Sequence, residues 1–134
     1  MQMSDKNSAF SGGPFPAAQY PLTDDGVLKV YSAGETTVLG FAGRDVPSEF
    51  NAAHYRAAIA DLLRANHCSV VAFDLTGVQL VPSGMLGLFV SLTRLPDMPL
   101  RVQVFNPSSE VREVLTLTRL NLLIEIHQLD LSGN

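Results

Sequence analysis

Residues 69–95 constrain the fold of this chain more than any other segment. Residues 69–75, SVVAFDL, form a nearly continuous apolar run rich in valine, which is typical of a central β-strand covered on both faces. A turn that contains Ser83 follows, and the residues after it predict a helix starting at Gly84. The apolar positions of this helix recur at spacings of three and four residues, and they are Met85, Leu88, Phe89, Leu92 and Leu95. A buried strand followed directly by an apolar helix favours an α/β fold.

The segments before this strand predict a hairpin and a helix. Residues 27–32 and 35–41 are two short apolar segments joined by Ala33-Gly34, a pattern that indicates a β-hairpin. Residues 51–65 predict an amphipathic helix, because apolar side chains again recur every three or four positions. These positions are Tyr55, Ala58, Ile59, Leu62 and Leu63, with Arg56, Asp61 and Arg64 between them.

The C-terminal part predicts a further strand, helix and strand. Residues 100–105 alternate apolar and polar, so we expect a strand that is half covered or near a sheet edge. Asn106 is a favoured N-cap and Pro107 suits the first helical position, so a helix is predicted to begin there. Its inward face would consist of Val111, Val114, Leu115 and Thr118. A last strand is predicted over residues 122–127.

The chain is predicted to form one domain preceded by a tail. Residues 1–24 combine Ser, Gly, Pro and Ala without periodicity, so we predict a flexible N-terminal tail and assign residues 25–134 to the domain. With 134 residues, of which 46% are hydrophobic, the chain can bury one core. The predicted fold class is α/β: an N-terminal β-hairpin followed by βα units with right-handed crossovers, which gives a mixed sheet with packed helices.

Composition argues against several partners and cofactors. The net charge is −4 and the nine Lys and Arg residues are scattered, so we expect no direct nucleic-acid binding. No window approaches the roughly 18 apolar residues of a membrane span, and the first ten residues do not resemble a secretory signal. The single Cys68 fits a small buried apolar residue in a reducing, cytoplasmic setting. We predict neither a metal nor a cofactor, because His54, His67 and His127 lack partners at ligand spacing.

Ser83 is the candidate functional residue. A hydrolase nucleophile elbow needs Gly two residues before and after the serine, but Val81 and Met85 occupy these positions, so we predict that the protein is not an enzyme. Gly84 and Gly87 lack the spacing and the following Lys of a phosphate-binding loop. Because Pro82 holds Val81 extended, Ser83 is predicted to be the N-cap of the following helix. A phosphoryl group there would add a charge of about −1.5 to −2 at a helix end that tolerates anions.

Three motifs resemble the STAS domain family, which includes the anti-sigma factor antagonists and the cytoplasmic modules of sulfate transporters. The strand ending Asp74-Leu75-Thr76-Gly77-Val78 is similar to the family's Asp-Leu-Ser/Thr-Gly-Val, and we expect Asp74 to accept hydrogen bonds from the next turn. The Ser83-Gly84 pair is similar to the family's switch turn, in which Val81 and Pro82 here replace an Asp and a Ser. Asn106, Pro107, Ser108, Val111 and Leu115 match the third motif, and the resemblance covers about residues 26–128.

The resemblance implies an anti-sigma factor antagonist that switches partners. Ser83 would be phosphorylated by a serine kinase that doubles as the anti-sigma factor, and a phosphatase would reset it. The expected partner-binding residues are Asp45, Pro82, Ser83, Gly84, Met85 and Gly87, with Asp45 one place earlier than the corresponding family residue. Two alternatives stay open: a constitutive, unphosphorylated adaptor in a signalling or membrane-transport complex, and a small hydrolase that uses Ser83.

Overall fold

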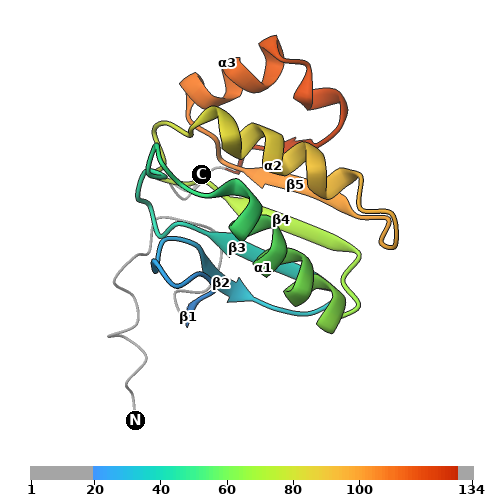
Figure 1. Ribbon diagram of the computed structural model, residues 1–134. Helices are drawn as coiled ribbons and strands as arrows, with labels where there is room; N and C mark the ends of the chain where they lie inside the picture. The colour runs from blue at the N-terminus through green and yellow to red at the C-terminus, as the bar shows by residue number, and fades with distance from the viewer. Residues whose placement is uncertain (1–19, 130–134) are drawn as a thin grey trace.

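The computed structural model describes residues 20–129, which form a mixed α/β fold with one six-stranded sheet (Figure 1). The strands lie in the sheet in the order in which they occur in the chain. They are β1 (Tyr20–Pro21), β2 (Lys29–Ser32), β3 (Thr36–Gly40), β4 (Val70–Asp74), β5 (Arg101–Phe105) and β6 (Glu125–His127). Pairing is antiparallel from β1 to β3 and parallel from β3 to β6. The predicted hairpin is therefore confirmed as β2 and β3.

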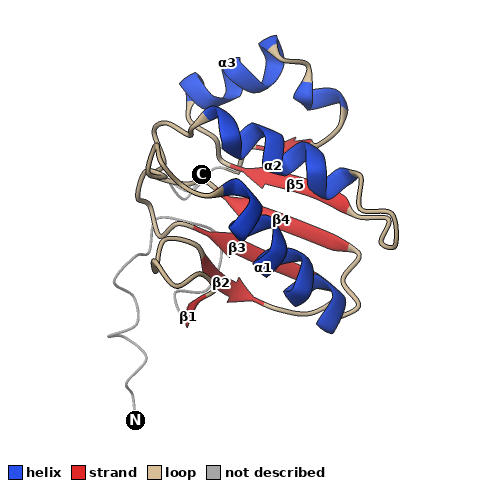
Figure 2. Ribbon diagram, in the orientation of Figure 1, coloured by secondary structure: helices blue, strands red, loops and turns tan. Residues whose placement is uncertain are grey.

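The helices gather on one face of the sheet. They are α1 (Ala52–Ala65), α2 (Ser83–Thr93), α3 (Ser109–Leu117) and the short 3₁₀ helix η2 (Leu120–Leu122). Each parallel strand is added beside its predecessor, so successive crossovers of the same hand carry their helices to the same face. Figure 2 shows α1 and α2 side by side across the sheet, with α3 beyond α2.

The main core lies between the sheet and the helices. Phe73 of β4 and Phe89 of α2 meet there with ring centroids 4.9 Å apart. The core side chains of α1, Tyr55, Ile59 and Leu63, are buried as the spacing predicts. On the other face of the sheet, Ala72 of β4 packs in a small cluster with Tyr31 and Val38. The prediction that β4 is buried on both faces is confirmed.

The folded part of the chain starts earlier than residue 25. Tyr20 pairs with Val30 and Pro21 with Lys29, so the last residues of the predicted tail add a strand to the hairpin. Thr23 is buried, and its hydroxyl donates to Asp25 at 2.6 Å. Residues 1–19 of the predicted tail lie outside the described residues.

The C-terminal elements correct three predictions. The helix α3 starts at Ser109 with Ser108 as its N-cap, whereas Asn106 has a left-handed φ of 56°. Only Val111 and Leu115 of the four predicted inward residues are buried. The last strand starts at Glu125, because residues 120–122 form η2 instead. The alternating burial of β5 confirms the half-covered alternative for this strand, which lies between β4 and β6 and not at an edge.

Candidate functional site

Ser83 lies among the loops at the carboxyl ends of the parallel strands. Because β3, β4 and β5 run in the same direction, residues 41–51, 75–82 and 106–108 all leave the sheet at one edge. Figure 1 shows these loops together at the left of the molecule. This is the edge at which open α/β sheets usually bind their ligands and partners.

The side chain of Ser83 is exposed at the start of α2. Ser83 is the first helical residue, and the N-cap is Pro82 with φ −70° and ψ 157°. The prediction that Ser83 is the N-cap is thus wrong by one residue, because Pro82 is itself extended and its carbonyl accepts from Met85 N at 2.9 Å. Pro82 offers no side-chain cap, and Ser83 Oγ makes no hydrogen bond within residues 20–129. The hydroxyl is therefore available to another molecule.

Asp45 connects the loop after β3 to the loop that leads into α2. Its Oδ1 accepts from the backbone N–H of Gln79 at 2.8 Å and from that of Leu80 at 3.4 Å. The same two loops touch at a pair of glycines: a Cβ on Gly77, whose φ is +84°, would lie 2.9 Å from the Cα of Gly43. Asp45 therefore positions the loop that leads to Ser83, and its expected contact with a partner stays a prediction.

A third loop joins the cluster through residues that the sequence patterns did not mark as functional. Ser108 Oγ donates to the carbonyl of Gln79 at 2.9 Å and accepts from Val111 N at 3.1 Å. Asn106 Nδ2 donates to Thr76 Oγ1 at 3.0 Å. Ser108 carried two signals in the sequence: its place in the third motif, and its residue type, because serine is as good an N-cap as asparagine.

Asp74, the last residue of β4, forms hydrogen bonds with the loop that follows this strand. Its Oδ1 accepts from the N–H of Thr76 at 3.0 Å and from the Thr76 hydroxyl at 2.6 Å, which confirms the predicted role. Asp74 is buried, and the resulting desolvation raises the pKa of its carboxyl despite the two hydrogen bonds from Thr76. Its Oδ2 has no hydrogen-bond partner among the described residues. Asp74 therefore holds the start of the loop that leads from β4 to Ser83.

The remaining predicted contact residues divide between surface and core. Gly87 is exposed, with nothing within 4 Å of the position of a Cβ. Gly84 is half-buried because the ring of Phe50 packs on it, 3.1 Å from where a Cβ would lie. Met85 is fully buried, so the prediction that its side chain contacts a partner is corrected: it belongs to the core beneath α2.

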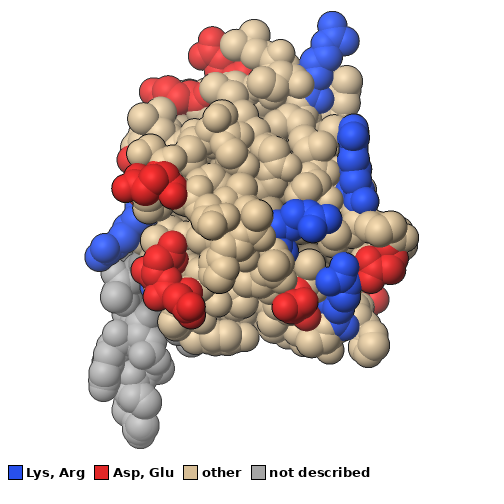
Figure 3. Space-filling view, viewed as in Figure 1, with Lys and Arg blue, Asp and Glu red and all other residues tan. Residues whose placement is uncertain are grey.

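The surface over α2 carries no charge. No Asp, Glu, Lys or Arg occurs in α2 or in residues 75–82. Figure 3 shows an uncharged centre on this face, with acidic and basic side chains at its margin. The loops of the same edge carry the acids Asp24, Asp25, Asp45 and Glu49. An uncharged helix surface next to an exposed hydroxyl is suited to contact with another protein.

Three further observations concern residues 20–129. No group of three or more His, Cys, Asp or Glu in this range could hold a metal ion. The thiol of Cys68 is buried, and its Sγ donates to the carbonyl of Val70 at 2.9 Å. None of the described helices combines the length and apolar character needed to cross a lipid bilayer.

Comparisons of the chain with protein-family models, curated proteins and solved structures gave no match. The family resemblance therefore stays a prediction, and the geometry around Ser83 is the basis for a functional proposal.

Proposed function

We propose that this protein is an anti-sigma factor antagonist of the STAS type, which is cytoplasmic and has no enzymatic activity. The unmodified protein binds an anti-sigma factor kinase through the Ser83 turn, and phosphorylation of Ser83 releases the kinase. The observation that carries this proposal is the exposed, unbonded hydroxyl of Ser83 at the start of α2, where no side chain caps the helix.

The architecture supports the proposed family. A hairpin followed by βα units is what the STAS resemblance implies, and β2 to β6 follow this order. The three motifs that carry the resemblance also lie together, because Thr76, Asn106 and Ser108 join the loops around the Ser83 turn. Motifs far apart in the sequence would thus form one functional edge.

The surface around Ser83 supports protein binding. Gly87 presents backbone rather than side chain, which permits close approach of another molecule. Leu80, directly before the turn, is 61% exposed and offers apolar surface. A partner that covers this region would remove apolar area from water without having to desolvate a charged side chain of α2.

A phosphoryl group on Ser83 would make binding of a partner to this surface unfavourable. It adds a charge of about −1.5 to −2, and neither α2 nor the preceding loop supplies a Lys or Arg to pair with it. Burial of an unpaired charge in an interface is strongly unfavourable. The free N–H groups at the start of α2 would still accommodate the anion in the unbound protein, so the fold is expected to survive modification.

The chemistry of the switch is assigned to the partner. Ser83 Oγ would attack the γ-phosphorus of ATP bound to the kinase, with ADP as the leaving group. The hydroxyl proton would pass to a base of the kinase, because no side chain in residues 20–129 accepts a hydrogen bond from Ser83. A phosphatase would hydrolyse the phosphate ester and restore the hydroxyl.

The first test is modification by a kinase. The protein is incubated with ATP and the ATPase of the histidine-kinase-like type encoded nearest to it, and the intact mass is measured. Wild type should gain about 80 Da, the mass of one phosphoryl group. Ser83→Ala should gain nothing. Ser91→Ala is the matched control, since Ser91 also lies on α2 but its hydroxyl donates to Leu88 O at 2.8 Å; it should be modified like wild type.

The second test is binding. Wild type and Ser83→Ala should bind the kinase alike, whereas Ser83→Glu should bind at least tenfold more weakly because it places a charge in the interface. Equal affinity of all three would contradict the switch and support the constitutive adaptor. Labelling of Ser83 by a serine-reactive phosphonate would instead support a hydrolase.

A further inference from the structure

Exposed apolar side chains lie on α3 and in the residues that directly follow it. Leu117 is 74% exposed and Leu122 is 72% exposed, whereas Leu123 and Val114 are 47% and 39% exposed. All four lie within residues 114–123, next to the buried Leu115 and Leu120. A contiguous exposed apolar patch can mark a contact surface.

Two stripes of side chains run along α3. Val111 and Leu115 face the core. Glu110, Glu113, Val114 and Leu117 follow the spacing i, i+3, i+4, i+7 and so share a second, exposed face. Arg119 and Leu122 follow the helix in sequence and are also exposed, and we refer to the stripe together with these two residues as the α3 surface. Its acidic residues precede Val114 and Leu117, and its one basic residue follows them.

The charges of the α3 surface have a fixed polarity. Glu110 lies in the first turn of the helix and Glu113 at its middle, and Arg119 lies just beyond its last turn. Neither Glu113 nor Arg119 has an ion-pair or side-chain hydrogen-bond partner within residues 20–129. If a second copy of the α3 surface approached in the antiparallel orientation, the acidic residues of each copy would therefore face Arg119 of the other copy.

We propose that two copies of this chain associate through the α3 surface about a two-fold axis. Such symmetry brings the same patch of each copy together and sets the two α3 helices antiparallel. The carboxylates of Glu110 and Glu113 then lie opposite Arg119 of the second copy, and the apolar centres meet. A parallel arrangement would instead place like charges together, so the polarity selects the antiparallel one.

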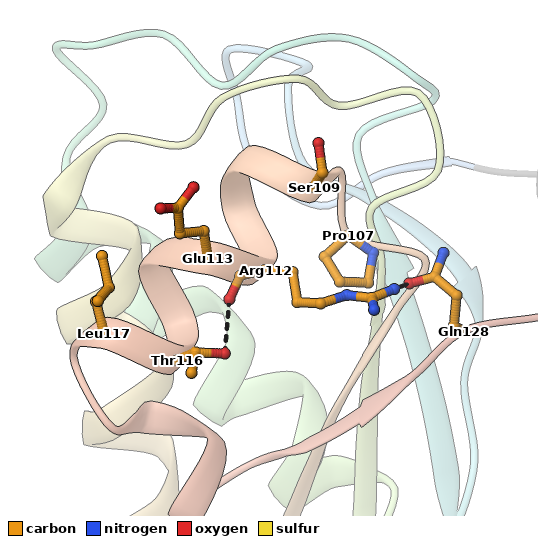
Figure 4. Close-up of a pocket in the computed structure, with 7 residues that line it drawn as sticks. All are labelled: Pro107, Ser109, Arg112, Glu113, Thr116, Leu117 and Gln128. Atoms are coloured by element: carbon orange, nitrogen blue, oxygen red, sulfur yellow. Dashed lines mark hydrogen bonds between the residues drawn. The ribbon is translucent and has the colours of Figure 1, made fainter.

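A hollow beside this stripe offers room for side chains of the second copy. Its volume is about 620 Å³, and both Glu113 and Leu117 line it. Figure 4 shows these two side chains on the same side of α3, whereas Arg112 points away from them toward Gln128. The α3 surface thus combines apolar side chains with a recess next to them.

The contact is small, so the dimer should be reversible. α3 has nine residues, which gives a helix of about 14 Å in length. Stable complexes usually bury about 800 Å² on each partner, more than one such helix face alone supplies. Neither Ser83 nor any other residue of α2 belongs to the α3 surface, so this inference does not depend on the proposed function.

Sedimentation velocity of the full chain over a wide concentration range tests the proposal. Wild type should shift from monomer toward dimer as concentration rises. Leu117→Glu should weaken association at least tenfold, with an unchanged circular dichroism spectrum. Leu80→Glu is the control, because Leu80 is exposed but lies outside the α3 surface; it should associate like wild type. Wild type that stays monomeric at every concentration would overturn the proposal.

Charge exchange tests the antiparallel arrangement. Arg119→Glu and Glu113→Lys should each weaken self-association, because each places like charges opposite one another. A mixture of the two variants should form heterodimers, since the exchanged charges then match. The double variant should recover self-association. Self-association of both single variants at wild-type strength would contradict the proposed pairing.

Discussion

At the scale of single residues, Gly40 shows how one missing side chain permits a packing arrangement. The ring of Tyr31 covers Gly40, and a Cβ there would lie 2.5 Å from Tyr31 Cζ. The Tyr31 hydroxyl accepts from Ala42 N at 2.8 Å, and burial raises the pKa of this phenol to about 12. The ring is thus held at both its face and its hydroxyl.

Gly40→Ala should therefore destabilise the protein. Overpacking against a fixed ring lowers the free energy of unfolding by about 1–3 kcal/mol. Urea denaturation would measure the change. Gly87→Ala is the control, because a Cβ there meets nothing within 4 Å, and it should raise the free energy of unfolding by about 0.5–1 kcal/mol. A Gly40→Ala variant as stable as wild type would contradict the packing of Tyr31.

At the scale of elements, the start of α3 shows a local signal overridden by distant contacts. Asn106 and Pro107 satisfy the preferences for a helix start, yet the helix begins two residues later than they predict. Asn106 Oδ1 instead accepts from Leu129 N at 2.7 Å, and its Nδ2 donates to Thr76. Because both amide atoms are used by other segments, Ser108 takes the role of N-cap.

Ser108→Ala should test this assignment. Loss of the cap leaves Val111 N without its side-chain acceptor, so the free energy of unfolding should fall by about 1 kcal/mol. Ser109→Ala should have little effect, because Ser109 is exposed at the first helical position. Urea denaturation of both variants would distinguish them. Equal losses in the two would exclude Ser108 as the N-cap.

At the scale of the whole molecule, an ion pair joins the last two strands of the sheet. Arg101 Nε lies 2.8 Å from Glu125 Oε2, and Arg101 Nη2 lies 2.9 Å from Glu125 Oε1. Hydrogen bonds from Arg101 outweigh the desolvation of Glu125 and lower the pKa of Glu125 from 4.5 to about 2. A lowered pKa in the folded state stabilises the protein above the ordinary pKa, and this contribution is lost as pH falls.

Glu125→Gln should therefore reduce the pH dependence of stability between pH 4.5 and about 2. Wild type should lose stability as pH falls through this range, and the variant should lose less. Thermal unfolding at several pH values would measure the difference. Arg101→Gln should flatten the same window, because it removes the other member of the pair. Identical pH profiles for wild type and both variants would show that the pair does not contribute.

Much of the architecture could be read from local patterns. The helices α1 and α2 follow from apolar periodicity, because each buries one face whose spacing is set by helix geometry. The strand β4 follows from its continuous apolar run, and the hairpin follows from two short apolar segments joined by a turn. The same reasoning placed Ser83 between a buried strand and an apolar helix, and the exposure of its side chain agrees with that placement. Met85 was predicted to contact a partner because it directly follows the Ser83-Gly84 pair. It is buried, because it is also the first residue of the helix face that packs on the core.

The amino-acid sequence by itself thus determines which segments form strands and helices, and it places the Ser83 hydroxyl between a strand and a helix. The partners of each segment came from packing in three dimensions. Asp45 accepts a hydrogen bond from Gln79, which lies 34 positions further along the chain. Asn106 adopts a left-handed conformation and forms hydrogen bonds with Thr76 and Leu129. Val114 stays exposed because the buried residues of α3 are Val111 and Leu115. The physical reason is that periodicity reports burial along one element, whereas hydrogen bonds between loops depend on where folding brings distant residues together.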